Sequence, residues 1–152
     1  MKPDQSRQFL TEALAELAQA RRHLNYSFQQ VAGLPADLNN ADAGQLESVE
    51  AFSSRFARTV DLLVNKVLRS LDRLELLPQG SLLDVVNRAE KRGFIQRAAD
   101  LREMKDVRNL IAHDYAGLKA AEIFTYCREQ KPALDAVCDR LAEYAGQRMR
   151  EL

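Results

Sequence analysis

The octapeptide RNLIAHDY, residues 108–115, combines side chains that suit phosphate chemistry. Arg108 carries a planar guanidinium that can bind two phosphate oxygens at once, and His113 carries an imidazole that exchanges protons near pH 7. An arginine that clamps phosphate and a histidine that acts as general acid and base are suited to phosphoryl transfer. RNA supplies its own nucleophile, the 2′-hydroxyl, so cleavage through that group needs no metal ion.

The sequence also argues against metal chemistry. The other histidine, His23, is far away in sequence, and no cluster of histidine and cysteine has metal-ligand spacing. Cys127 and Cys138 are eleven residues apart in a segment that reads as helix, about 16 Å along its axis, so they cannot form a disulfide within one chain. We therefore expect no metal and no cofactor, and we expect both thiols to lie in a core or an interface.

The geometry of the octapeptide leaves its chemistry open. On an ideal helix Asn109 and His113 share a face, whereas Arg108 and His113 point about 140° apart. They form a pair only if the helix unwinds after Ala112, or if a second copy of the segment supplies the missing partner. A purely structural interpretation also exists, because arginine and histidine are both favoured near the C-terminus of a helix.

The elements that position this segment read as helices throughout. Leucine or valine recurs every seven residues in the first helix, about 5–31, and a turn-rich linker, 32–44, ends in a capping box of Asp42 and Gln45. An apolar pattern at three- and four-residue steps predicts a second helix from 45 to 74. Ser81 and Asp84 cap a short third helix, which ends at Gly93 with Phe94 folding back.

The chain then continues with a fourth helix, about 95–113, and a last helical segment, about 118–150. Pro132 lies inside that segment, where we expect it to kink or restart the helix. The sequence therefore predicts an all-α, single-domain antiparallel bundle of four to five helices over residues 1–152.

The charge of the chain is balanced, with 22 basic and 22 acidic residues, so no bulk positive field gathers nucleic acid. Residues 85–108 nevertheless carry seven basic and four acidic side chains, a local excess that leads into the octapeptide. Arg102 and Lys105 in this stretch are possible RNA contacts, as are Arg55 and Arg58 on the second helix. A solvated helix face is the alternative interpretation of all four.

The segment VVNRAEKRGFIQRAADLREMKDVRNLIAHDY and the second helix beginning VEAF resemble the HEPN superfamily. More narrowly, they resemble HepT-like proteins and the nucleotidyltransferase substrate-binding proteins encoded beside small MNT nucleotidyltransferases. The resemblance implies an all-α, usually dimeric protein, and often a metal-independent endoribonuclease whose R-x4–6-H motifs meet at the dimer interface. It assigns Arg108 and His113 as the catalytic pair, Asn109 as a polar positioning group, and Tyr115 as the tyrosine that a partner MNT antitoxin modifies with AMP.

Three hypotheses follow. The first is a HepT-like toxin of a HEPN/MNT toxin–antitoxin pair, a homodimeric RNase that the partner silences at Tyr115. The second is a non-catalytic subunit that presents substrate to a nucleotidyltransferase, which the net charge of zero favours. The third is a structural bundle in which the motif is accidental. With no apolar run near 20 residues and no signal peptide, we expect a cytoplasmic protein without a membrane span.

Overall fold

The computed structural model describes residues 2–152, which form helices joined by turns and loops and contain no strand. In chain order the elements are α1 (Pro3–Val31), α2 (Ala43–Leu62), η1 (Leu63–Leu68, a π-helical segment), α3 (Arg69–Leu74), α4 (Leu82–Lys91), α5 (Ala98–His113) and α6 (Ala120–Glu151). The segments α2, η1 and α3 follow one another without a break. The all-α bundle that the sequence predicts is therefore confirmed.

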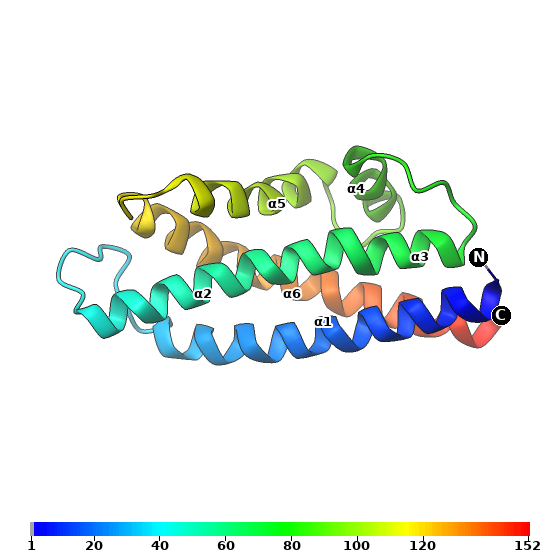
Figure 1. The fold of residues 1–152 in the computed structure, drawn as a ribbon, viewed down its shortest axis with the longest axis horizontal. Coiled ribbons are helices and arrows are strands. Elements are labelled where there is room, and N and C mark those ends of the chain that lie inside the picture. The colour runs from blue at the N-terminus through cyan, green and yellow to red at the C-terminus, as the bar shows by residue number, and fades with distance from the viewer. Residues whose placement is uncertain (1) are drawn as a thin grey trace.

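The helices pack around one core of apolar side chains contributed by all of them. The seven-residue repeat of α1 is buried at Leu10, Leu17, Leu24 and Val31, as the sequence predicts. The α2 residues Phe52 and Phe56 are fully buried, and Phe52 meets Phe124 of α6 edge to face with ring centroids 6.0 Å apart. Helices α1, α2 with α3, and α6 are the long elements of the bundle, and α4 and α5 pack on it (Figure 1).

The predicted helix ends are confirmed by their hydrogen bonds. The Asp42 carboxylate accepts from the Gln45 amide at 2.8 Å, and the Gln45 side chain accepts from the Asp42 amide at 2.9 Å. Ser81 and Asp84 bond reciprocally in the same way at the start of α4. Gly93 has φ +81°, and the Phe94 amide bonds back to the Ala89 carbonyl, as in a Schellman ending.

Two details of the helices differ from the sequence expectation. Pro132 does not restart the last helix, because α6 runs continuously from Ala120 to Glu151. Buried side chains on both sides of the proline, such as Cys127 and Leu134, hold the helix in place despite one missing backbone hydrogen bond. The second helix is not uniformly α-helical either, since η1 interrupts it with Leu63, Val64, Val67 and Leu68 all fully buried.

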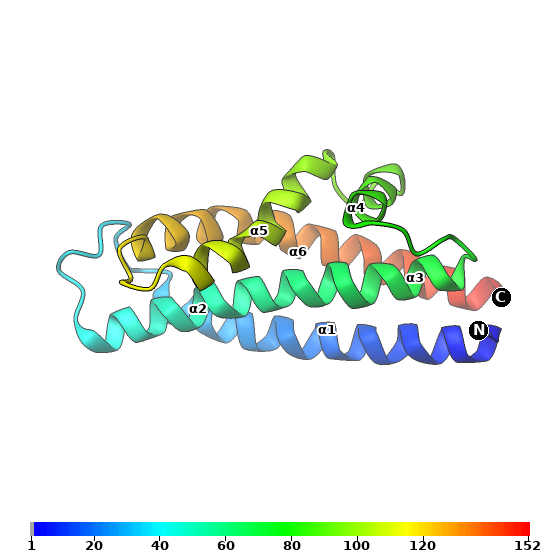
Figure 2. The same cartoon turned by 45° about the horizontal axis from the view of Figure 1, so that its top comes forward.

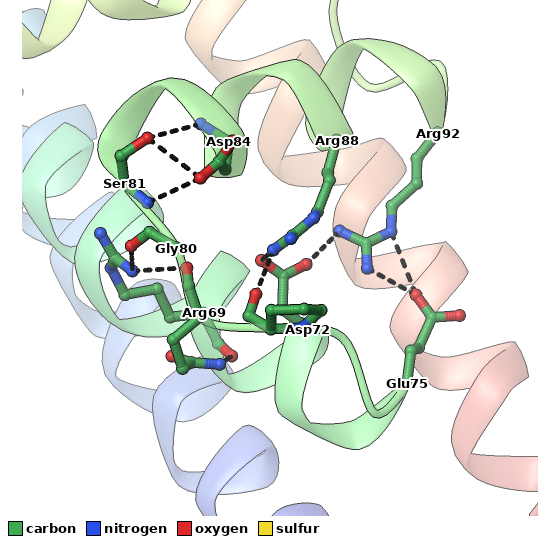
Figure 3. Close-up of polar contacts among 10 residues, drawn as sticks. Arg69, Asp72, Glu75, Gly80, Ser81, Asp84, Arg88 and Arg92 are labelled. Carbon is green, nitrogen blue, oxygen red and sulfur yellow. Dashed lines mark hydrogen bonds and ion pairs between the residues drawn. The ribbon is translucent and has the colours of Figure 1, made fainter.

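The short helix α4 buries Val85, Val86 and Ala89 in the core, and ion pairs add to its attachment to the bundle (Figure 3). Asp72 of α3 is completely buried and lies 3.1 Å from Arg88 and 2.8 Å from Arg92, both near the end of α4. Arg92 also lies 2.6 Å from Glu75, which in turn accepts hydrogen bonds from Tyr144 and Arg148 of α6. The basic residues of the segment 85–92 thus serve partly to fix α4, which then sets the start of α5.

The two cysteines are buried and free, and belong to the core. Burial raises the pKa of each thiol to about 12, so both remain protonated and unreactive at neutral pH. Among residues 2–152, no helix combines the length and apolar character that crossing a membrane requires.

Candidate functional site

The octapeptide occupies the last two turns of α5 and the loop that follows. In two views of the ribbon this end of α5 lies far from both chain termini, beside the N-terminal half of α2 (Figures 1 and 2). Arg108, Asn109 and His113 are all exposed to solvent, and His113 is the last residue of the helix. The motif is therefore accessible to a large substrate.

Because α5 stays helical through His113, the helix does not unwind after Ala112. Arg108 and His113 consequently point about 140° apart within one protomer. Between their directions lie the exposed polar residues Asn109 and Arg102 and the exposed Ala112, so the outer face of α5 forms a mostly polar strip. Of the two routes to a working pair that the sequence left open, the unwinding of the helix after Ala112 is therefore not the one that this structure adopts.

Arg108 is anchored by a residue that the sequence analysis did not identify. The carboxylate of Asp61, at the end of α2, lies 2.7 Å from Arg108 and 2.7 Å from Lys105. The Asp61 and Lys105 side chains are only 17% and 18% exposed, whereas Arg108 is 67% exposed. One terminal nitrogen, Nη1, bonds Asp61, so the other N–H groups of the guanidinium stay available to bind phosphate.

Arg108 and Asp61 line a groove of about 340 Å³ between α2 and α5. Arg58 lines the same groove, together with Ser54, Ala57 and Ile111. With Lys105 on Asp61, three cationic side chains and one carboxylate gather here, which leaves a local positive charge. A polyanion such as RNA would be attracted to this part of the surface despite the net charge of zero.

The other candidate RNA contacts are placed differently. Arg102 is exposed on the polar strip of α5 near the direction of His113. Arg55 faces α1 instead, where its guanidinium donates to the His23 carbonyl at 3.1 Å and to the Ser27 hydroxyl at 2.8 Å. The structure thus brings Arg58, Lys105 and Arg108 together around Asp61, but it does not bring Arg55 to this group.

Tyr115 lies in the short loop between α5 and α6, and its side chain is 90% exposed. The loop is held by Asp114, whose carboxylate accepts from the Lys119 amide at 3.0 Å and whose carbonyl accepts from the Gly117 amide. Gly117 has φ +68°, a backbone conformation that favours glycine. These contacts present the Tyr115 hydroxyl to solvent on an ordered turn.

Asp61 could be suspected from the sequence on one signal only. It follows Val60 and precedes Leu62 and Leu63, so a charged group interrupts an apolar run. A charge that is half-buried in such a position usually has an ion-pair partner. The identity of the ion-pair partner of Asp61 depends on how α5 packs against α2, and the sequence alone does not give that packing.

The fold is an all-α bundle, and its R-x4-H motif, residues 108–113, is exposed beside the basic groove between α2 and α5. The protein therefore belongs to the class of helical bundles that carry an exposed arginine–histidine motif. A family model described as ribonuclease HepT-like matches residues 6–141, which is most of the chain. The chain belongs to this HepT-like family of the HEPN superfamily, and the membership supports a ribonuclease-like function. Neither the comparison with curated proteins nor the comparison with solved structures gives a match.

Proposed function

We propose that this protein is a metal-independent endoribonuclease and the toxin of a HEPN/MNT pair, with Arg108, Asn109 and His113 as its catalytic residues. The observation that carries the proposal is the exposed pair on α5, with Arg108 fixed by Asp61 and His113 free on the same polar strip. Family membership adds the expected class of reaction.

The proposed reaction uses the RNA as its own nucleophile. His113 accepts the proton of a 2′-hydroxyl, whose oxygen forms a bond to the neighbouring phosphorus while the bond from phosphorus to the 5′-oxygen breaks. The same His113, now protonated, then donates that proton to the departing oxygen, which leaves as a 5′-hydroxyl. Arg108 binds the non-bridging oxygens and stabilises the charge that develops on them. The products are a 2′,3′-cyclic phosphate and a 5′-hydroxyl end.

The active unit in this proposal is a homodimer. Arg108 and His113 diverge on a regular helix, so a two-fold interface that faces two α5 helices toward each other would place the arginine of one protomer near the histidine of the other. Asn109, which shares the His113 face, would then orient the substrate phosphate.

Tyr115 is the proposed site of control by a partner MNT-type nucleotidyltransferase. The phenol oxygen attacks the α-phosphorus of ATP, forms an O–P bond and displaces pyrophosphate, and the phenol proton passes to a base on the partner. The 90% exposure of Tyr115 permits this approach. An AMP phosphate two residues from His113 would occupy the space in which the substrate phosphate binds, and it would neutralise the positive charge that attracts that phosphate.

The test compares the purified protein with its His113→Ala variant on RNA in EDTA, after intact mass has shown that neither carries added AMP. We expect only the unchanged protein to cut, leaving 2′,3′-cyclic phosphate ends. Equal cutting by both proteins would contradict the catalytic assignment. If neither cuts, the second hypothesis, a non-catalytic subunit of a two-component nucleotidyltransferase, replaces the first, in line with the net charge of zero.

A further inference from the structure

A second groove lies on the other side of α5, between α5 and α6. It measures about 290 Å³ and contains the apolar side chains of Val107, Leu110, Ile123 and Tyr126. On α5 the lining residues run from 103 to 110, about two helical turns or 10 Å. Apolar side chains of two neighbouring helices therefore line a groove along about two turns of α5, which is the length over which two turns of a further helix could make contact.

The rim of this groove is acidic. Glu103, Asp106 and Glu122 line it with a single cation, Lys119. Within residues 2–152 these three carboxylates form no ion pair, whereas Asp61, Asp72 and Glu75 elsewhere in the bundle are all paired. Burial raises the pKa of the Tyr126 phenol, and nearby Glu103 raises it further, so this side chain stays neutral and adds no charge to the groove.

Exposed apolar side chains gather at one end of the same groove. Leu110 is 47% exposed, and the loop that contributes Lys119 to the groove carries Leu118 at 87% and Tyr115 at 90%. Three large apolar or aromatic side chains left in water within nine residues are typical of a surface that a partner covers. The groove therefore offers apolar contacts that are bordered by the unpaired carboxylates of Glu103, Asp106 and Glu122.

The two sides of α5 differ in charge. Arg58, Lys105 and Arg108 lie toward α2, and Glu103, Asp106 and Glu122 lie toward α6. RNA would be repelled from the acidic side, so the two grooves suit different ligands. A partner that carries lysine or arginine around apolar residues would fit the acidic side in both charge and polarity.

We propose that the α5–α6 groove docks a lysine- or arginine-bearing amphipathic helix of a protein partner. The groove ends at the loop that carries Tyr115, so a protein held there would have this tyrosine within its reach. The idea that this partner is the enzyme that modifies Tyr115 rests on the proposed function. The binding chemistry of the groove is independent of that function.

The experiment uses the full chain and a fluorescein-labelled peptide of 14 residues, with leucine at helical spacing and lysine at all other positions. Fluorescence anisotropy at physiological salt gives its affinity. A variant with Glu103→Gln, Asp106→Asn and Glu122→Gln should bind the peptide at least about tenfold more weakly. A second peptide with glutamate in place of every lysine should not bind.

The matched control variant carries Glu12→Gln, Glu47→Gln and Glu143→Gln, three exposed carboxylates without an ion pair among the described residues. It changes the net charge equally and should bind the lysine peptide within about twofold of the unchanged protein. Equal weakening in both variants, or no binding by the unchanged protein, would overturn the proposal. So would a dimer that falls apart only in the groove variant, because the occupant would then be a second copy.

These measurements contain no RNA and no nuclease assay. If the protein fails to cut RNA but the peptide still distinguishes the two variants, the proposed function fails while the docking groove stands. If the protein cuts RNA but the peptide binds the groove variant and the control variant equally, the docking groove fails while the proposed function stands.

Discussion

Asp61 orients Arg108 without hiding it. The carboxylate contacts one guanidinium nitrogen at 2.7 Å and also contacts Lys105 at 2.7 Å, so it is fixed from two sides. A long arginine side chain that is held before substrate arrives loses less conformational freedom on binding phosphate. Asp61 therefore acts, in our interpretation, as a positioning residue for the proposed reaction.

The Asp61→Asn variant tests this role. The neutral amide holds Arg108 more weakly, so we expect the kcat/KM for RNA cleavage to fall about tenfold, less than the loss caused by Arg108→Ala. Cleavage kinetics of the purified variants provide the measurement, with Glu16→Gln as a control that removes the distant ion pair to Lys66. Faster cleavage by Asp61→Asn would show instead that Asp61 competes with the substrate phosphate for Arg108.

Among elements, α4 depends most visibly on charged contacts. Its ten residues are joined to α3 and α6 through Asp72, Glu75 and the two arginines Arg88 and Arg92. Burial raises the pKa of Glu75, but the hydrogen bonds from Tyr144, Arg92 and Arg148 outweigh it and hold the pKa below its ordinary value of 4.5. The ionised form of Glu75 is thus favoured in the folded protein.

This lowered pKa makes the stability of the bundle depend on pH. A carboxyl group with a lowered pKa contributes stability that is fully present above its unfolded value and is lost as pH falls through the folded one. We expect Glu75→Gln to lower the free energy of unfolding at pH 7 by about 1–3 kcal/mol, because hydrogen bonds to a charged group are lost. The variant should also lose less further stability than the unchanged protein as the pH falls below 4.5.

Urea unfolding followed by circular dichroism, repeated from pH 7 to pH 3, measures both effects. Glu151→Gln is the control, since Glu151 contacts the same Arg148 but is 62% exposed. Identical pH dependence in the Glu75 variant and the unchanged protein would contradict the assigned role of this network.

For the whole molecule, the divergence of Arg108 and His113 on α5 predicts a site shared between protomers. Arg108→Ala and His113→Ala should each be inactive as pure homodimers. When the two are mixed and allowed to exchange subunits, half of the dimers contain both variants, and each of these has one complete site. We expect activity to recover to about a quarter of that of the unchanged protein.

RNA cleavage measured before and after subunit exchange checks this prediction, and native mass spectrometry of the two variants, one of them isotopically labelled, shows whether mixed dimers have formed. The control mixes the double variant Arg108→Ala, His113→Ala with His113→Ala, which leaves no complete site in any dimer. If mixed dimers form and remain inactive, each site takes both residues from one chain, and the dimer model of the site is wrong.

The sequence by itself determined the local features of this protein. Helix periodicity, the Asp42 and Ser81 caps and the turn at Gly93 depend on neighbouring residues, and all of them are present in the structure. The family could also be predicted, because the spacing of Arg108, His113 and Tyr115 within one segment carries the resemblance. Of the two outcomes expected at Pro132, a restart of the helix does not occur, because core packing on both sides of it outweighs a single lost hydrogen bond.

Only the tertiary structure decided which side chains share a surface. Asp61 and Arg108 are 47 residues apart, and their contact depends on how α5 packs against α2. The same packing sends Arg55 toward α1, keeps Arg58 beside Arg108, and separates the basic side of α5 from its acidic side. Helix periodicity states which face of each helix is buried, but the rotation and position of one helix against another follow from side-chain packing across the whole core.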